Sequence, residues 1–367
     1  MIVNKNKLTF FDKLILWLNC AAAAALLIGY LAPITDPRQV WIVAFFGLAY
    51  PPVLLVNALF IVYWLFRNKK WALVSFIAIL VGWKVLNNNI GFRLPATTIA
   101  HRDSGMLRVM NYNVHDFKKY GAKNDISTKH EILEIIAHEQ PDVIGFEEFY
   151  SRKKGQYSMV DSLKKILNTD QVYFKSILDN TRGMALFSKY PIVNTGIIWL
   201  NEAQNLNQAI FIDIKKQGKT IRIFAIHLQS ISFDPEDYKY LKDVSKEGAA
   251  DVQSSKRIGA KLKRAFLKRS EQVAKMKQQL TLCPFPYVVM GDFNDTPSSY
   301  AVSQMSKGLK NAFREKGSGL GRTYNGDFPN YQIDYIMVTP QFDVLTYGVI
   351  RKKLSDHYPV YSDLRLK

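Results

Sequence analysis

The segment Val288-Val289-Met290-Gly291-Asp292-Phe293-Asn294-Asp295-Thr296-Pro297 decides the fold of this chain. A short apolar run passes directly into a loop of polar residues, which is typical of a buried strand that ends at a site. At the extended period of two, Asp292 and Asn294 face the same side beyond the strand end. Such a carboxylate and amide can accept a proton from a nucleophilic water and hold that water. The alternative is an Asx-rich turn with a structural role.

Five further segments combine an apolar run with a polar side chain at one of its ends. They cover residues 107–114, 142–148, 223–230, 332–338 and 354–360. Their polar residues are Asn113, Glu148, His227, Asp334, Asp356 and His357. Each of these residues alone is more often structural, as a capping Asp or a core His. Together they predict that the strand ends surround one site.

The first hundred residues are far more apolar than the rest, with runs at residues 14–31, 40–66 and 71–86. About 20 apolar residues cross a bilayer, so the first two runs qualify and the third is marginal. Tyr50-Pro51-Pro52 predicts a kink inside the second run. We therefore expect a membrane anchor of about three transmembrane helices over residues 1–92 and a polar linker over residues 93–106. A cleaved signal peptide is the alternative for the first run, but no clear small-residue cleavage site precedes Pro33.

Basic residues predict the orientation of this anchor. They precede the first run and fill the loop after the second, at Lys5, Lys7, Lys13, Arg67, Lys69 and Lys70. Positive charge marks cytoplasmic segments, so we expect an inner-membrane, multi-pass protein with a cytoplasmic N-terminus. With three spans the region after residue 106 lies outside the cytoplasm. If the third run does not span, that side reverses.

The net charge of +18 suits a polyanionic or phosphate-bearing substrate or an anionic membrane surface. A basic surface that serves only solubility is the alternative. Cys20 and Cys283 lie in such different settings that they do not predict a disulfide.

From residue 107 onward, strand-like runs alternate with a few helical patterns, which predicts an α/β domain with layered sheets. We expect strands at 107–114, 143–146, 185–188, 197–200, 209–214, 220–226, 287–290, 335–338 and 344–350, and helices at 128–139 and 158–167. Residues 232–279 interrupt this alternation as an acidic and then basic helical insertion. Its basic part is either an amphipathic helix packed on the domain or a surface for anionic lipid or substrate.

In order and context, the six polar segments resemble those of the endonuclease/exonuclease/phosphatase superfamily. The resemblance covers residues 107–366, and Gly291-Asp292-Phe293-Asn294 and Ser355-Asp356-His357 are its most specific parts. It implies a deoxyribonuclease I-like, four-layer α/β/β/α sandwich of two packed mixed β-sheets as the catalytic domain over residues 107–367. With the preceding transmembrane helices, the chain resembles a membrane-anchored, bacterial-type member.

The resemblance also implies a divalent metal ion held chiefly by Glu148, with Asn113 beside it and Asp356 nearby. The expected ion is Mg²⁺, with Mn²⁺ or Ca²⁺ as alternatives. Metal and imidazole groups would neutralise charge that develops on a phosphorus atom.

The remaining roles that the resemblance implies are catalytic. Asp292 would activate the attacking water, and Asn294 would orient it. His227 and His357 would contact the scissile phosphate, and Asp334 would pair with His357.

Two positions depart from the family pattern. Glu147 stands where Gln is usual, which we expect to add negative charge near the metal, and Gln332 stands where Arg is frequent, which removes a cation. Arg269 and Gln272 match a family helix that faces the sheet, and we interpret them as scaffold.

The sequence therefore predicts a metal-dependent phosphodiesterase or phosphatase held at a lipid bilayer. Its substrate would be a phosphate ester, which is a lipid headgroup, a soluble phosphoester or a nucleic acid. An extracytoplasmic nuclease acting on DNA or RNA is the alternative, and a non-catalytic membrane scaffold is a more remote one. No protein partner can be inferred.

Overall fold

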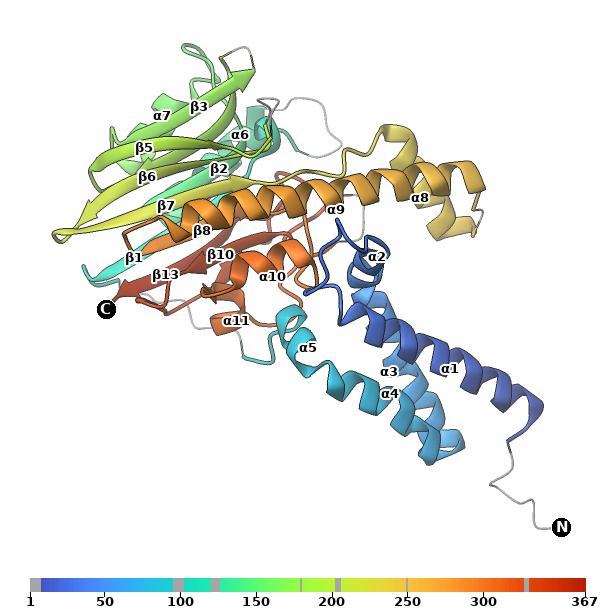
Figure 1. The fold of residues 1–367 in the computed structure, drawn as a ribbon. Helices are drawn as coiled ribbons and strands as arrows, with labels where there is room; N and C mark the ends of the chain where they lie inside the picture. The colour runs from blue at the N-terminus through green and yellow to red at the C-terminus, as the bar shows by residue number, and fades with distance from the viewer. Residues whose placement is uncertain are drawn as a thin grey trace.

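The computed structural model describes residues 8–94, 102–119, 126–178, 180–201, 206–248, 250–326 and 330–367. Half of the predicted linker, residues 95–101, lies outside this described part. A bundle of N-terminal helices projects from one side of an α/β sandwich (Figure 1).

The N-terminal helices are α1 (Phe10–Gly29), α2 (Ile42–Leu48), α3 (Tyr50–Arg67), α4 (Lys69–Val81) and α5 (Trp83–Asn89). Among the described residues, α1 and α3 are each long and apolar enough to cross a membrane. The pair α4 and α5 would make a third span if taken together, but the two helices meet at an angle of 70°. The marginal third run is therefore a bent pair.

The prediction of one kinked helix over residues 40–66 is wrong. The chain breaks at Ala49 into α2 and α3, and Pro51 and Pro52 lie in the first turn of α3. Backbone N–H groups in a first helical turn have no intrahelical acceptor, so proline costs nothing there. The two prolines start a helix rather than bend one.

A buried polar chain joins the three longest helices of the bundle. Asn19 of α1 donates to Ser75 of α4 over 2.5 Å, and Ser75 donates to Asn57 of α3 over 2.8 Å. All three side chains are buried among apolar neighbours. Side-chain hydrogen bonds of this kind fix helix pairs where the surroundings offer no water.

Two mixed sheets form the sandwich. One has the order β11-β13-β1-β2-β4-β3, with β12 also paired to β13, and the other has the order β5-β6-β7-β8-β10-β9. The strands of the first sheet are β1 (Met106–Asn113), β2 (Val143–Tyr150), β3 (Val172–Leu178), β4 (Arg182–Ser188), β11 (Phe342–Val344), β12 (Gly348–Val349) and β13 (Val360–Leu366). Those of the second are β5 (Ile192–Trp199), β6 (Gln208–Lys216), β7 (Lys219–His227), β8 (Tyr287–Asp292), β9 (Lys310–Asn311) and β10 (Asp334–Val338).

Helices cover both outer faces of this sandwich. The helices of the domain are η1 (His115–Phe117), α6 (Ile126–Glu139), α7 (Met159–Leu167), α8 (Pro235–Glu247), α9 (Val252–Thr281), α10 (Tyr300–Ser306) and α11 (Ala312–Lys316). One apolar cluster fills the space between the sheets, a second packs α6 and α7 on the first sheet, and a third packs α9 and α10 on the second. The predicted four-layer α/β/β/α arrangement is confirmed.

Several strand predictions were incomplete. The expected strand at 344–350 is two short strands, β11 and β12, and the expected strand at 197–200 is the end of the longer β5. Neither β3 nor β13 was predicted, although β13 pairs with β1 in the middle of its sheet. β13 was missed because it contains the polar residues Ser362 and Asp363. Both are buried, and Arg108, which pairs with Asp363, lies far away in the sequence.

The helical bundle contacts the sandwich directly. Asn89 of α5 donates to Ser298 over 2.9 Å, and Ser270 of α9 donates to Asp36 over 2.6 Å. The rings of Phe45 and Phe266 meet edge to face with centroids 5.3 Å apart. Polar and aromatic contacts thus hold the bundle against α9 and the loop after β8.

We predict that Asp363 is a major stabilising residue of the sandwich. It accepts hydrogen bonds from Arg108 over 2.7 and 2.9 Å, and both side chains are buried. Asp363→Ala removes one of the two carboxylates that neutralise the buried guanidinium, the other being Glu139, and leaves the Thr346 hydroxyl without its acceptor, so we expect a loss of about 3 kcal/mol of unfolding free energy. Pulse proteolysis of the full chain in detergent across a urea series measures it.

The control is the exposed pair of Asp103 and Arg365, whose atoms lie 2.5 Å apart. Asp103→Ala should cost less than about 1 kcal/mol. Equal losses in the two variants would contradict the prediction.

Candidate active site

Six strands bring the predicted residues to one end of the sandwich. β1, β2, β7 and β8 end there, whereas the antiparallel β10 and β13 begin there. Strand register aligns Asn113 with Glu147, His227 with Asp292, and Asp334 with Asp292. Side chains from strands far apart in the sequence therefore meet at this end.

Gly291 permits the closest of these approaches. Its φ is +152°, and a Cβ built on it would lie 2.0 Å from the carbonyl oxygen of Ile226 in β7. Any other residue would push β7 and β8 apart, and with them His227 and Asp292.

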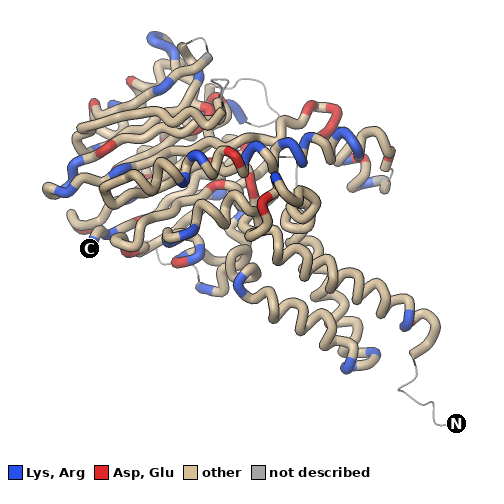
Figure 2. The backbone as a smooth tube through the Cα atoms, in the orientation of Figure 1, with Lys and Arg blue, Asp and Glu red and all other residues tan. Residues whose placement is uncertain are grey.

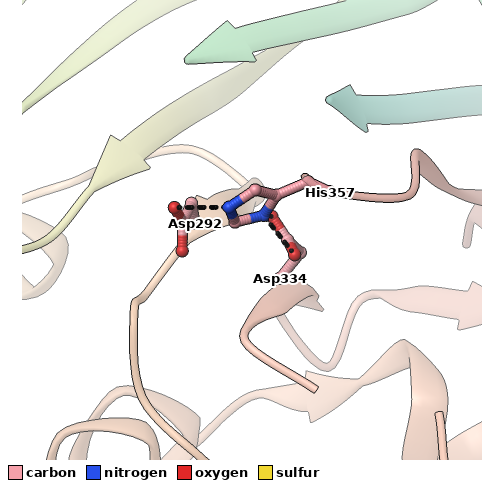
Figure 3. Close-up of side chains that lie close together, drawn as sticks. All are labelled: Asp292, Asp334 and His357. Carbon is pink, nitrogen blue, oxygen red and sulfur yellow. Dashed lines mark hydrogen bonds and ion pairs between the residues drawn. The ribbon is translucent and has the colours of Figure 1, made fainter. Parts of the chain in front are cut away.

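A buried histidine lies between two carboxylates (Figure 3). Nδ1 of His357 is 3.0 Å from Oδ2 of Asp334, and Nε2 of the same ring is 3.6 Å from Oδ2 of Asp292. Burial lowers the pKa of His357, but the charges of Asp334 and Asp292 raise it well above its ordinary value. The imidazole is therefore cationic at neutral pH, and Asp334 fixes its orientation.

Asp292 is almost fully buried, and burial raises its pKa to about 6 against the opposing effect of His357. It accepts a hydrogen bond from Asn113 Nδ2 over 3.1 Å. At neutral pH most of the population is the carboxylate, and a pKa near the working pH suits a group that takes a proton from water.

Asn294 joins Asp292, but not in the predicted way. β8 ends at Asp292, and Asn294 adopts a left-handed backbone with φ of +52°. Its backbone N–H donates to Asp292 over 2.8 Å, and its side-chain amide donates to Asp292 and to the Leu228 carbonyl over 3.2 and 3.0 Å. The convergence comes from an Asx turn rather than from strand alternation.

Glu148 projects into the site from a bulge in β2. The register with β4 shifts between Phe146 and Phe149, and Glu148 has φ of +48°. Burial raises its pKa, but the hydrogen bond from His115 and nearby imidazoles lower it to about 2. Glu148 is therefore an ionised carboxylate, held in a strained backbone conformation that aims it at the site.

His227 lies at the end of β7, almost fully buried. Its Nε2 is 3.7 Å from Asp292 and 3.9 Å from Glu148. Among the described residues neither ring nitrogen has a hydrogen-bond partner. A buried imidazole without partners is available to contact a ligand or an ion.

Asp356 and an unpredicted residue, His115, complete this end of the sandwich. Nδ1 of His115 lies 3.3 Å from Glu148 and 3.8 Å from Asp356. The hydrogen bond to Glu148 raises the pKa of His115. Sequence reasoning missed His115 because η1, which follows β1, has positive φ angles that strand or helix periodicity cannot describe. Its place two residues after Asn113 was the available signal.

Glu147 corrects another expectation. It points away from Glu148 into the core, is fully buried, and accepts a hydrogen bond from Asn111 over 2.9 Å. Burial, reinforced by Asp334 and Asp292, raises its pKa well above the ordinary value. The raised pKa favours the neutral acid, so Glu147 does not add the expected negative charge to the site.

The donor set suits a hard divalent cation, which prefers carboxylate and amide oxygens. Nδ1 of His115 already lies near both Glu148 and Asp356, the two expected carboxylate ligands, and its raised pKa favours positive charge there. Asn113 presents its NH₂ group to Glu148 and Asp292, so ligation by its oxygen requires the opposite amide orientation. A second cluster of possible ligand atoms, in Asp292, Asp334 and His357, lies within 4.8 Å. There the imidazole is already paired with both carboxylates.

The scaffold interpretation of Arg269 and Gln272 agrees with their contacts. Arg269 donates to Asp295 over 2.9 Å and to the Gln229 carbonyl over 3.0 Å. Gln272 accepts from the Gln229 backbone over 2.8 Å. Both residues fix the loops after β7 and β8.

A sandwich with this ring of acidic, amide and histidine residues defines a phosphoesterase-type hydrolase fold. Residues 110–357 match the endonuclease/exonuclease/phosphatase family, so the chain belongs to that family. Members of this family hydrolyse phosphate esters and typically use divalent metals. Residues 12–89 match a domain of unknown function. A search among curated proteins found no match.

Solved structures agree on the fold. An endonuclease/exonuclease/phosphatase from Bacteroides vulgatus superposes with a TM-score of 0.53 at 18% identity, covering 71% of this chain and 99% of that one. A humanized D. rerio TDP2 gives 0.52 at 16% identity, with 72% and 100% covered. D. rerio TDP2 complexed with a single-strand DNA product gives 0.52 at 15% identity, with 71% and 99% covered.

We predict that Glu147→Gln stabilises the protein increasingly as pH rises. Above the ordinary Glu pKa the unfolded state has lost the proton that folded Glu147 keeps, so wild-type stability falls until the raised folded pKa is reached. Within that window the variant gains up to about 1.4 kcal/mol per pH unit over wild type. Pulse proteolysis in EDTA between pH 4 and 9 measures the difference.

The matched control is Glu271→Gln, since Glu271 is half exposed and paired with Lys268. Its stability difference from wild type should barely change with pH. A pH-independent difference for Glu147→Gln would mean that Glu147 is ionised in the folded state.

Proposed function

We propose that the chain is a membrane-anchored, divalent-metal-dependent hydrolase of phosphate esters. One observation carries this proposal: His357, Asp334, Asp292, Asn113 and Glu148 form one connected set of contacts at the open end of the family fold. A non-catalytic scaffold has no need of such a set, since each buried charge costs stability.

In this proposal Asp292 takes a proton from the attacking water while Asn294 keeps the carboxylate aimed at it. The water oxygen bonds to phosphorus, and the bond from phosphorus to the leaving oxygen breaks. His227 and cationic His357 contact the phosphate oxygens, and Asp334 keeps the His357 ring in position. Glu148 and Asp356, with Asn113 beside them, would hold Mg²⁺, Mn²⁺ or Ca²⁺, which stabilises charge on the phosphate.

A nuclease is the second candidate. The observations that favour it are the net charge of +18 and the likeness in fold to a TDP2 that holds a single-strand DNA product. That likeness, at 15% identity, concerns the fold alone.

We also propose that the bundle lies in the inner membrane, with the catalytic domain outside the cytoplasm. Two candidate spans, α1 and α3, support membrane insertion. The start of α1 and the loop between α3 and α4 lie at the end of the bundle away from the sandwich (Figure 1). Lys and Arg residues gather at that end (Figure 2). Since basic ends stay in the cytoplasm, the sandwich would lie on the opposite side.

We predict that Asp292→Asn and His357→Ala each lower kcat/KM by at least about 100-fold, because each removes a group that handles a proton or phosphate charge. The full chain is assayed with DNA, RNA, phospholipid vesicles and small phosphomonoesters. EDTA should abolish activity, and Mg²⁺, Mn²⁺ or Ca²⁺ should restore it. Asp343→Asn, at a half-exposed carboxylate on β11, is the control. Equal activity in wild type and both site variants would refute the assignment.

The orientation gives a separate prediction. A C-terminal fusion to a reporter that works only outside the cytoplasm should be active, and the same reporter fused after Asn68 should be inactive. Whole-cell reporter assays measure both. An inactive C-terminal fusion with an active fusion at Asn68 would reverse the orientation.

A further inference from the structure

The catalytic pocket has walls of two kinds. Its volume is about 220 Å³. Glu148, Asp292 and His357 belong to its polar lining. Its apolar lining is made by Leu48, Ile231, Phe233 and Phe266, which share one apolar cluster. A hydrolytic site that takes only polar esters has no use for an apolar wall of this extent.

Leu48 comes from the helical bundle rather than from the catalytic domain. It is the last residue of α2, and only Ala49 separates it from α3, a candidate membrane span. The bundle meets the sandwich at this end of α3 (Figure 1). The apolar wall of the pocket is therefore continuous with helices suited to a bilayer.

Several contacts hold α2 in this place. Phe45 packs edge to face on Phe266, and Ala44, Phe45 and Leu48 share an apolar cluster with Ile258 and Leu262 of α9. These contacts fix Leu48 at the pocket wall.

A second apolar cavity lies behind Tyr331, which lines both spaces. Its volume is about 510 Å³, and Tyr50, Pro51, Leu54 and Leu55 of α3 contribute to its lining. Tyr331 thus separates the catalytic pocket from a cavity that α3 helps to line.

Lys and Arg residues recur along α9 (Figure 2). Lys263 Nζ lies 4.4 Å from the centre of the Trp41 ring, near the start of α2. Trp and Lys side chains are both common where a protein meets lipid headgroups.

We propose that the substrate is an amphiphilic phosphate ester drawn from the bilayer. Its phosphate would reach Asp292, His227 and His357, while its hydrocarbon chain would lie against the apolar wall of Leu48, Ile231, Phe233 and Phe266. This inference rests on the proposed hydrolase function and names its substrate class. Leu48 and Ile231 match a hydrocarbon chain better than a nucleic acid, because they offer no aromatic face on which a base could stack.

The test compares two chromogenic diesters, methyl and octyl p-nitrophenyl phosphate, which share a leaving group and differ only in the chain. The full chain is assayed in detergent with Mg²⁺. Each fully buried methylene raises kcat/KM about fourfold, so we expect an octyl-to-methyl ratio of about 100 when roughly half of the added methylenes are buried. A single-stranded oligonucleotide is assayed in parallel.

Two variants on α2 distinguish an effect of the pocket wall on the octyl-to-methyl ratio from an effect of detergent on that ratio. Leu48→Asn should lower the octyl-to-methyl ratio at least tenfold, by about the value of two buried methylenes. Ile42→Asn, at an exposed position of α2 away from the pocket, should leave the ratio unchanged. An equal fall in both variants would overturn the assignment of the wall.

The remaining outcomes keep the inference distinct from the proposed function. Hydrolysis of both diesters at equal kcat/KM would overturn the inference and leave the hydrolase function standing. A higher kcat/KM on the oligonucleotide than on the octyl diester would identify a nuclease instead. Absence of metal-dependent hydrolysis of every substrate would refute the hydrolase function itself.

Discussion

The burial of the Asp292 carboxylate among donors and a cation is the constraint on which the rest of the site depends. Both neighbouring strands, β7 and β10, align a site residue with it, and Asn113, Asn294, His227 and His357 all lie within contact of its oxygens. A carboxylate taken from water at this depth is costly unless several donors and a cation compensate it. That cost explains why so many strands deliver polar side chains to one point, and why His357 carries a positive charge there.

Sequence reasoning predicted the residues of this site but not their local geometry. An apolar strand that ends on Asp, Asn or His can be predicted from the sequence, because the apolar run and its alternation are visible in consecutive residues. The left-handed Asn294, the bulge at Glu148 and the irregular turn at His115 depend on backbone angles that no such period describes. All three lie at the site, where function tolerates strain that a scaffold would avoid.

Long-range partners set the other limit on prediction. Asp363 lies in β13 because Arg108, a residue at the opposite end of the domain sequence, neutralises it, and without that partner β13 resembles a polar tail. The fold changes the interpretation of Glu147 in the same way. In the sequence it is a second negative charge beside Glu148, whereas complete burial next to other carboxylates makes it a neutral acid. Whether an acidic side chain in a sequence is ionised therefore depends on how deeply the fold buries it and on the charges around it.

The helical bundle is coupled to the Asp292 carboxylate through a short loop. Ser298, six residues after Asp292, accepts a hydrogen bond from Asn89, and a Cβ built on Gly47 would come within 3.1 Å of its carbonyl oxygen. The loop that follows the central strand of the site is thus packed against the bundle and cannot move independently of it. The same contact brings Leu48 to the pocket wall. A flexible tether would only keep a hydrolase near a membrane. In the proposed membrane-anchored hydrolase, a docked bundle that shapes the pocket would instead make the helices part of substrate recognition, because apolar surface at the site would then belong to the element that meets the lipid.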